Sequence, residues 1–177
     1  FLSIVVPCFN EEESLGLFQS EIQKTLSNQD YEIIYVNDGS SDNTLEKITD
    51  LAKTASNVKY LSFSRNFGKE SAIYAGLKYA RGDMVCVMDA DLQHPPSMLP
   101  DMIQTIHDED FDVVAARRIS RKGEPKIKAF FSHMFYKVFN AISQLNLVEG
   151  ATDYRVMTRP VVDALLLAEG DLVVACI

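Results

Sequence analysis

The chain has 177 residues, of which 47% are hydrophobic and 24% are charged, and its formal net charge is −8. This is the composition of a globular domain with an apolar core, and the acidic balance argues against general nucleic-acid binding. The basic residues are unevenly spread, because the segment 117–128 holds six of them against the single acid Glu124. Such a basic strip on an acidic protein indicates a local anionic partner, either a phosphate group or a membrane surface.

The cysteines indicate the cellular compartment of the protein, and the two chain ends indicate whether the sequence is part of a longer chain. Cys8, Cys86 and Cys176 form no C-x-x-C pair, which favours reduced thiols in a cytosolic compartment over a disulfide framework. No stretch approaches the roughly 20 apolar residues that span a bilayer. Since the chain begins at Phe1 inside a predicted strand and stops at Ile177 in an apolar run, we expect one soluble domain over 1–177, truncated at its C-terminus.

Apolar runs and amphipathic segments alternate along the first 116 residues. Short β-rich runs predict strands over 2–6, 31–36, 58–63, 84–88 and 112–116. Apolar residues at helical spacing predict helices between them, over 15–26, 43–55, 71–80 and 97–106. Asn43 is the expected N-cap of the second helix, and Asp42 is expected to be a turn or capping residue. The alternation predicts an α/β fold with a mostly parallel central sheet and helices on both faces.

After residue 116 the pattern changes. The segment 126–145 carries a wide aromatic stripe at helical spacing, interrupted by Lys128, His133 and Lys137. Such a stripe most often packs on a core, but the basic run before it favours an amphipathic helix that lies on a membrane surface. Residues 151–157 are predicted as a loop that enters a short strand, and 159–168 as a helix.

Polar side chains follow three of the predicted strands. Asn10 and Glu11 follow the first strand, Asp38 follows the second, and Asp89 and Asp91 follow the fourth. In a parallel sheet these strand ends meet at the edge where ligands bind. If the backbone stays extended to Asp91, both carboxylates of the D-x-D pair point to the same side. Their oxygens suit Mg²⁺ or Mn²⁺, so a metal site is predicted there.

Several motifs in order resemble those of the family 2 glycosyltransferases. The segments 7–11 (PCFNE), 36–42 (VNDGSSD) and 89–96 (DADLQHPP) carry this resemblance. The segments 65–70 (RNFGKE), 116–118 (ARR) and 153–157 (DYRVM) are similar to the polyprenyl-phosphate branch, typified by dolichol-phosphate mannose synthase and bactoprenol glucosyltransferase. The likeness covers nearly the whole chain.

The resemblance implies a Rossmann-like GT-A fold and a metal-dependent, inverting hexosyltransferase. The donor it implies is a nucleotide diphosphate sugar, with UDP-glucose favoured over GDP-mannose. The implied acceptor is a polyprenyl phosphate at the cytosolic face of a membrane, where the longer protein would be located. Nucleic acid is not an expected partner, and homo-oligomerisation stays open.

The resemblance also implies roles for individual residues. The nucleotide sugar would be bound by Pro7, Phe9, Asn10, Glu11, Asp38, Lys69, Asp89, Ala90 and Asp91. Phe9 replaces an expected tyrosine, which keeps ring stacking but loses a hydroxyl contact. Mg²⁺ or Mn²⁺ would be held by Asp89, Asp91 and Gln93. The acceptor phosphate would be bound by Arg117, Lys128, Ser132 and Arg155, with lysine in place of arginine at 128. The catalytic residues would be Asp91 and Asp153.

A lipid phosphate is a different acceptor from a hydroxyl group. A hydroxyl needs a general base, whereas a phosphate monoester, with a second pKa of about 6, is already largely ionised. It needs positioning and charge compensation, which the planar guanidinium of Arg117 offers. Asp153 is therefore either a base or an acceptor-positioning group.

Some residues keep two interpretations. Asp153 and Arg155 could form a structural ion pair instead of a catalytic one. Lys69 either contacts the diphosphate or is a solvated loop lysine. His94 could reach a metal, but we prefer a His that fills a turn before the prolines.

Other activities remain open as well. One is a family 2 enzyme that uses a saccharide hydroxyl as acceptor, and another is a non-catalytic nucleotide-binding domain. A signalling receiver and a nucleotidyltransferase fit less well, because the loop after the first strand is neither a receiver acid pair nor a basic Gly-rich phosphate loop.

Overall fold

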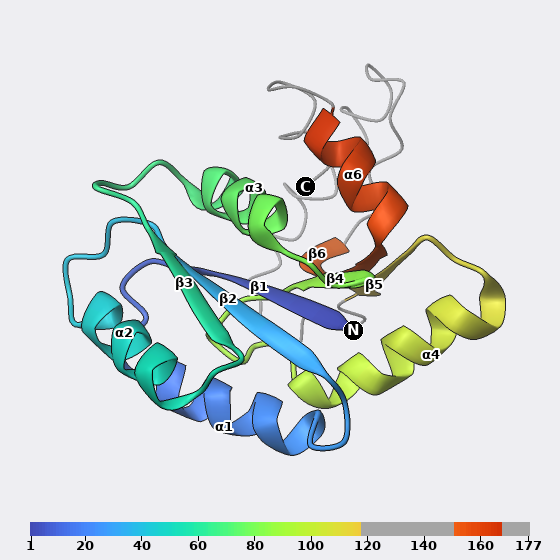
Figure 1. Cartoon of the computed structure of the whole chain (residues 1–177), viewed down its shortest axis with the longest axis horizontal. Coiled ribbons are helices and arrows are strands. Elements are labelled where there is room, and N and C mark those ends of the chain that lie inside the picture. The colour runs from blue at the N-terminus through green and yellow to red at the C-terminus, as the bar shows by residue number, and fades with distance from the viewer. Residues whose placement is uncertain (118–150, 168–177) are drawn as a thin grey trace, which may run out of the picture. The chain divides into compact units, whose positions relative to one another are not determined.

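A computed structural model describes residues 1–117 and 151–167 of the chain (Figure 1). The predicted membrane-surface helix over 126–145, including Lys128 and Ser132, lies outside these residues. The chain divides into two compact units, one of 1–114 with 153–177 and one of 115–152. The single domain over 1–177 stays a prediction.

One six-stranded sheet forms the centre of the fold, in the order β3-β2-β1-β4-β6-β5. Its strands are β1 (Leu2–Cys8), β2 (Tyr31–Asn37), β3 (Val58–Ser62), β4 (Met84–Val87), β5 (Val113–Arg117) and β6 (Ala151–Thr158). β1 pairs in parallel with β2 and β4, and β2 pairs in parallel with β3. β6 is antiparallel to β4, with Val87 opposite Arg155. The sheet is mostly parallel, as predicted, with one antiparallel strand beside β4.

Helices cover both faces of the sheet, as the strand–helix alternation predicts. They are α1 (Leu15–Thr25), α2 (Thr44–Thr54), α3 (Lys69–Tyr79), α4 (Leu99–Glu109) and α6 (Arg159–Leu167), with a short 3₁₀ turn η1 (Pro96–Met98) before α4. Figure 1 shows α1, α2 and α4 on one face and α3 and α6 on the other.

Two apolar layers hold the helices to the sheet. On one face, residues of β1, β2, β4 and β6 pack with α3 and α6 in a single buried cluster that includes Val5, Ile73 and Val162. On the other face, the buried Tyr35 ring of β2 meets Phe18 of α1 edge-on at 6.2 Å between ring centroids. Burial of such faces is the main stabilising term for an α/β sheet, and it fixes the strand ends that carry the polar loops.

Three local expectations differ from the structure. Residues 151–157, predicted as a loop that enters a short strand, belong entirely to strand β6. Helix α3 begins at Lys69 and not at Ser71, directly after Gly68, whose φ is 100°. Asn43 makes no side-chain cap bond at α2. Asp42 caps instead, because its carboxylate accepts the N–H of Thr44 at 3.0 Å and the N–H of Glu12 at 3.2 Å. The carboxylate thus satisfies a helix donor and joins two loops at once.

Within 1–117 and 151–167, no helix reaches the length and apolar character that crossing a bilayer requires.

Candidate functional site

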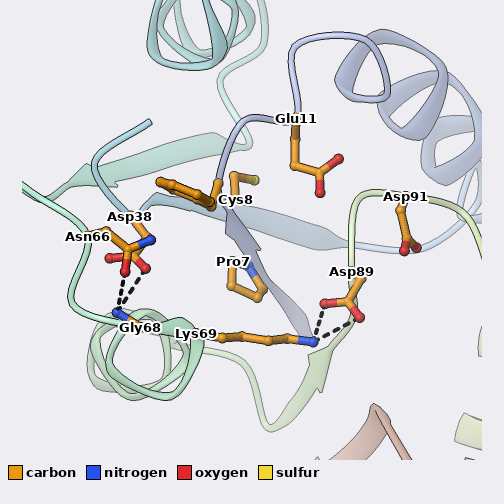
Figure 2. Close-up of a pocket in the computed structure, with 10 residues that line it drawn as sticks. Pro7, Cys8, Glu11, Asp38, Asn66, Gly68, Lys69, Asp89 and Asp91 are labelled. Atoms are coloured by element: carbon orange, nitrogen blue, oxygen red, sulfur yellow. Dashed lines mark hydrogen bonds and ion pairs between the residues drawn. The ribbon is translucent and has the colours of Figure 1, made fainter. Parts of the chain in front are cut away.

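A pocket of about 480 Å³ opens at the carboxyl ends of β1, β2 and β4, beside the start of α3 (Figure 2). Its walls come from four separate chain segments. The lining residues are Pro7, Cys8, Phe9, Glu11, Asp38, Asn66, Gly68, Lys69, Asp89 and Asp91. Seven of the nine residues predicted to bind a nucleotide sugar are in this set, and Asn10 and Ala90 are the two that are not. The carboxyl ends of the parallel strands therefore bring together most of the residues predicted to bind a nucleotide sugar.

Asp38 fixes one wall of the pocket. Its buried carboxylate accepts the backbone N–H of Phe67 at 2.7 Å and that of Gly68 at 3.0 Å. Figure 2 shows the bond from Gly68 to Asp38, beside a second bond from the same N–H to Asn66. Hydrogen bonds from backbone donors to a carboxylate are stronger than neutral ones. Asp38 therefore ties the 65–68 loop to the end of β2.

Gly39 allows the same two loops to touch. Its φ is 66°, and a Cβ added there would lie 2.2 Å from the carbonyl carbon of Arg65 and 2.5 Å from the backbone nitrogen of Asn66. A side chain at this position would therefore meet backbone, in a conformation that already disfavours one.

Asn10 and Glu11 hold the loop after β1. The Asn10 side-chain oxygen accepts the N–H of Ser41 at 2.8 Å, and its own N–H donates to Ser40 at 3.0 Å. Asn10 thus links the loops after β1 and β2 and does not line the pocket. The Glu11 N–H donates to Thr44 at 2.7 Å, while its carboxylate, which lines the pocket, accepts the Ser14 hydroxyl at 2.7 Å.

Phe9 is the aromatic residue in the pocket wall, and 47% of it is exposed. Its ring offers a flat surface on which a nucleobase could stack.

Lys69 forms the charged centre of the opposite wall. Its ammonium nitrogen lies 2.7 Å from Asp89 Oδ1 and 2.6 Å from Asp153 Oδ2, and the residue is in the first turn of α3. Partial burial lowers the pKa of Lys69, but hydrogen bonds to Asp153 and Asp89 outweigh burial and raise it. Lys69 is therefore an ion-paired helix residue and not a solvated loop lysine, and its contact with a diphosphate stays a prediction.

Asp153 reaches this centre from β6, 84 residues after Lys69 in the chain. Its other oxygen lies 3.6 Å from Nη2 of Arg155. The ion pair between Asp153 and Arg155 is therefore present, and roles for Asp153 as a base and for Arg155 as an acceptor ligand stay predictions.

Asp91 shares the pocket with Asp89, but the route of the backbone differs from the expectation. β4 ends at Val87, and Ala90 and Asp91 lie in a turn that is followed by Leu92 at φ 56°. The expectation of extended backbone up to Asp91 is therefore wrong. The Asp91 carboxylate accepts the N–H of Gln93 at 3.0 Å, which stabilises the turn. Ala90 is buried and does not line the pocket.

His94 is directed to the protein and not to the pocket. Its ring lies 5.9 Å from the ring of Tyr154, and its Nε2 atom is buried with no hydrogen-bond partner among the described residues. His94 does not line the pocket, in agreement with the turn-filling interpretation.

The charged wall has the chemistry of a partial metal site. No group of three or more His, Cys, Asp or Glu side chains in the described part of the chain could hold a metal ion alone. Asp89 and Asp91 nevertheless bring two carboxylates to one pocket, and the ammonium of Lys69 lies as a cation beside Asp89. This donor set fits a hard divalent ion that takes its remaining ligands from a bound diphosphate.

Three lining residues were not predicted: Cys8, Asn66 and Gly68. The RNFGK motif was the available signal for Asn66 and Gly68, since a Gly before a predicted helix indicates close backbone approach. Cys8 lies between two predicted residues, and burial, together with the charges of Glu11 and Asp89, raises the pKa of its thiol. Cys8 is therefore a packing residue of the pocket floor and not a reactive thiol.

The predicted acceptor residues divide between described and undescribed parts. Arg117 ends β5, belongs to the 115–152 unit and is exposed. Lys128 and Ser132 lie outside the described residues. That Arg117, Lys128 and Ser132 bind an acceptor phosphate stays a prediction.

Comparison with known proteins places this fold and pocket in a family. The chain is 46% identical over 173 residues to a putative glycosyltransferase, CsbB, of Bacillus subtilis, covering 96% of the chain and 52% of that protein. It is 40% identical over 174 residues to the bactoprenol glucosyl transferase of Shigella phage SfV, covering 97% of the chain and 56% of that protein. The chain thus spans about half the length of the curated relatives it matches.

A solved structure shows the same fold. The mannosyltransferase PcManGT of Pyrobaculum calidifontis, determined with GDP-Man and Mn²⁺, superimposes with a TM-score of 0.65 at 18% identity, covering 93% of the chain and 46% of that protein. The GT-A fold implied by the motifs is thereby confirmed. A family model described as glycosyl transferase family 2 matches residues 3–166. The chain therefore belongs to glycosyl transferase family 2, which confirms the resemblance found in its motifs.

Proposed function

We propose that this chain is the catalytic part of an enzyme that transfers a hexose from a nucleotide diphosphate sugar to a polyprenyl phosphate. The observation that carries the proposal is the pocket itself, in which an aromatic wall at Phe9 faces a charged wall at Lys69, Asp89 and Asp91. Relatives named bactoprenol glucosyl transferase, at about 40% identity, support glucose as the sugar and a polyprenyl phosphate as the acceptor.

The nucleotide would lie against the wall made by β1 and β2. Phe9 offers its ring to the base, while Asp38 and Glu11 offer carboxylate oxygens to base and ribose donors. UDP-glucose is the favoured donor. GDP-mannose is the alternative, since the solved mannosyltransferase of this fold binds GDP-Man.

The diphosphate would lie along the charged wall. Asp89, Asp91 and Gln93 would hold Mg²⁺ or Mn²⁺, which when bound stabilises the negative charge that develops on the leaving diphosphate. Lys69 would give a second positive charge to the same phosphate oxygens from the start of α3. Asp89 and Asp91 would thus hold the leaving group in place and would not activate the acceptor.

The acceptor would attack from the side of the sugar opposite the diphosphate. An oxygen of the lipid phosphate forms a bond to the anomeric carbon while the bond from that carbon to the diphosphate oxygen breaks, which inverts the configuration. Arg117, Lys128, Ser132 and Arg155 would position the acceptor phosphate. Because that phosphate is already ionised at neutral pH, with a second pKa of about 6, Asp153 would orient cationic groups and not remove a proton.

The acceptor chemistry also defines where the enzyme would work. A polyprenyl phosphate is confined to a membrane, and the basic strip and the predicted helix over 126–145 would bring the pocket to the cytosolic surface. The longer protein would therefore act at that surface.

A thermal-shift panel tests the donor site. UDP-glucose, GDP-mannose and a CDP sugar are each added with and without Mn²⁺, and we expect UDP-glucose with Mn²⁺ to raise the Tm most. The absence of metal-dependent stabilisation by every nucleotide sugar would overturn the donor site.

A transfer assay with a full-length protein tests the acceptor. We expect glucose to be transferred to undecaprenyl phosphate and not to free saccharides. Transfer to saccharide hydroxyls alone would replace the lipid acceptor with the alternative acceptor class.

A further inference from the structure

The ammonium of Lys69 is bonded to Asp89, one of the carboxylates that a metal would need, and to Asp153. Its ammonium lies 2.7 Å from Oδ1 and 2.9 Å from Oδ2 of Asp89, and 2.6 Å from Oδ2 of Asp153. A lysine ammonium has three N–H donors, and here three carboxylate oxygens surround it. Figure 2 shows the Lys69 side chain running along the pocket wall to both oxygens of Asp89.

This arrangement conflicts with metal binding at Asp89. A divalent ion that coordinates Asp89 would come within a few ångströms of the ammonium, where two cations repel one another. The groups are only partly screened, because the side chains of Lys69, Asp89 and Asp153 are 38%, 33% and 36% exposed. A metal at Asp89 is therefore disfavoured as long as the ammonium stays bonded to both oxygens of that carboxylate.

A nucleotide diphosphate supplies the group that would draw the ammonium away. Its phosphate oxygens are anionic acceptors, and charge-assisted hydrogen bonds from lysine to phosphate are strong. Lys69 is suited to the exchange because four flexible methylenes carry its charge, and because its backbone is fixed at the start of α3.

We infer that Lys69 is a counter-cation that blocks Asp89 in the ligand-free protein and moves to the diphosphate when nucleotide binds, so that nucleotide binding opens the metal position. This inference rests on the proposed function. It makes metal and nucleotide binding mutually dependent through one side chain, and it assigns Lys69 the role of a positioning residue for metal loading.

The test is a Mn²⁺ titration of the 177-residue chain, followed by the electron paramagnetic resonance of free Mn²⁺, with and without UDP. In the wild-type chain we expect weak Mn²⁺ binding that UDP strengthens by about 10- to 100-fold, the usual size of coupling between sites. In Lys69→Met we expect UDP-free Mn²⁺ binding to be about tenfold tighter than in wild type and the strengthening by UDP to fall at least about fivefold.

A matched control lies on the same helix. Lys78 is in the last turn of α3 and exposed, so Lys78→Met removes the same charge and should leave both Mn²⁺ affinities unchanged. Lys69→Gln is the second variant, because it removes the charge but can still donate hydrogen bonds to Asp89 and Asp153 if the methionine variant does not fold. We expect it to change Mn²⁺ binding in the same direction.

The outcomes separate the two proposals. If the wild-type chain binds no Mn²⁺ with UDP, and none when the titration is repeated with GDP, the proposed donor site fails. If it does bind Mn²⁺, but the Lys69 variants bind Mn²⁺ without UDP no more tightly than the wild type, the donor site stands and the role of Lys69 is overturned. A lower Tm without a change in Mn²⁺ affinity would leave Lys69 as a structural ion pair only.

Discussion

The two walls of the pocket are held in different ways. On the wall formed by β1 and β2, polar side chains bond to backbone groups, as Asp38 does with Phe67 and Gly68 and Asn10 does with Ser41. On the opposite wall, Lys69 bonds to Asp89 and to the neighbouring Asp153 through side chains alone, although Asp91 on the same wall accepts the N–H of Gln93. A hydrogen bond to a backbone group keeps its partner when a ligand binds, whereas a side-chain ion pair can exchange one of its partners for the ligand. The first wall is therefore preorganised for recognition, and the second can rearrange around charge.

Glu32 and Lys59 form an ion pair far from the pocket. This pair shows that two charged side chains in contact are not always free to exchange partners. Glu32 on β2 bonds to Lys59, but its buried carboxylate also accepts the Ser3 hydroxyl at 2.6 Å and the N–H of Arg81 at 2.9 Å. Here a backbone donor and a neighbouring hydroxyl fix the carboxylate. The pair of Lys69 with Asp89 has no such support among the described residues.

The largest effect is expected at Asp91, on the rearrangeable wall. Asp91→Asn keeps the oxygen that accepts the Gln93 N–H but removes the charge offered to a metal. We expect transfer to slow by roughly 10²- to 10⁴-fold with little change in Tm, since metal stabilisation of a leaving group contributes several kcal/mol. The measurement is the rate of glucose transfer by a full-length protein.

Asp108→Asn is the control for Asp91. It makes the same charge change on α4, where Asp108 bonds only to Gln104 in the described part of the chain, and should leave the rate unchanged. Equal rates for Asp91→Asn and the wild type would remove Asp91 from the metal site.

The next effect tests the rigidity of the recognition wall. Gly39→Ala would place a methyl group 2.2 Å from the Arg65 backbone at a φ of 66°. We expect the free energy of unfolding to fall by more than about 2 kcal/mol, measured by urea denaturation. Gly16→Ala is the matched control, because nothing lies within 4 Å of an added Cβ there. That substitution should be neutral or stabilise by up to about 1 kcal/mol, and equal losses in both variants would show that the loops are not in close contact.

A smaller effect is expected at Glu32, with a dependence on pH. Burial opposes ionisation of this carboxyl, but hydrogen bonds from Lys59, Ser3 and the Arg81 N–H outweigh it and lower its pKa. The stability it adds is therefore present above the ordinary pKa of about 4.3 and is lost as the pH falls through the lowered value. Glu32→Gln should cost about 1–3 kcal/mol at pH 7, and this difference should shrink towards pH 3.

Glu21→Gln provides the comparison for Glu32. Glu21 forms an exposed ion pair with Lys24 on α1, and such pairs contribute less than about 1 kcal/mol. A pH-independent loss of stability in Glu32→Gln would argue against the fixed ion pair.

The smallest effect is expected at Phe9. Phe9→Ala removes the ring that lines the recognition wall, and loss of one base-stacking contact should weaken UDP binding by about 1–2 kcal/mol, or roughly tenfold. Isothermal titration calorimetry measures this directly. Phe111→Ala removes a similarly exposed ring beside β5 and should leave the affinity for UDP unchanged, whereas an unchanged affinity in Phe9→Ala would place the base elsewhere.

Much of the fold could be predicted because its signals are local. The buried runs of β1, β2 and β4 and the amphipathic faces of α1 and α2 follow from spacing within one segment. The placement of β6 beside β4 could not, since it depends on pairing between residues about 70 apart, such as Val85 and Met157. The observed start of a helix also differs from the predicted one where a single glycine or proline changes the backbone conformation, as Gly68 does before α3.

In the candidate site, too, some residues could be predicted from the local sequence and others could not. Glu11, Asp38 and Asp89 could be located from their positions after predicted strands, because parallel topology brings those strand ends together, whereas Phe9 was indicated only by the family resemblance. Asn10 was assigned to the ligand, although its side chain bonds to the neighbouring loop. Nothing in the local sequence indicates that Lys69 meets Asp153, because the contact is created by tertiary packing.

The position of β6 has a consequence for how the protein acquires its site. Synthesis proceeds from the N-terminus, so β1 to β4 and most of the pocket wall can assemble from neighbouring strand–helix–strand units before Asp153 has been made. The charged wall is completed only when β6 pairs back onto β4, a contact of high sequence separation that forms slowly relative to local ones. The ion pair between Lys69 and Asp153 therefore requires β6 to be in place, and a chain arrested before β6 would have the recognition wall without its complete charge cluster.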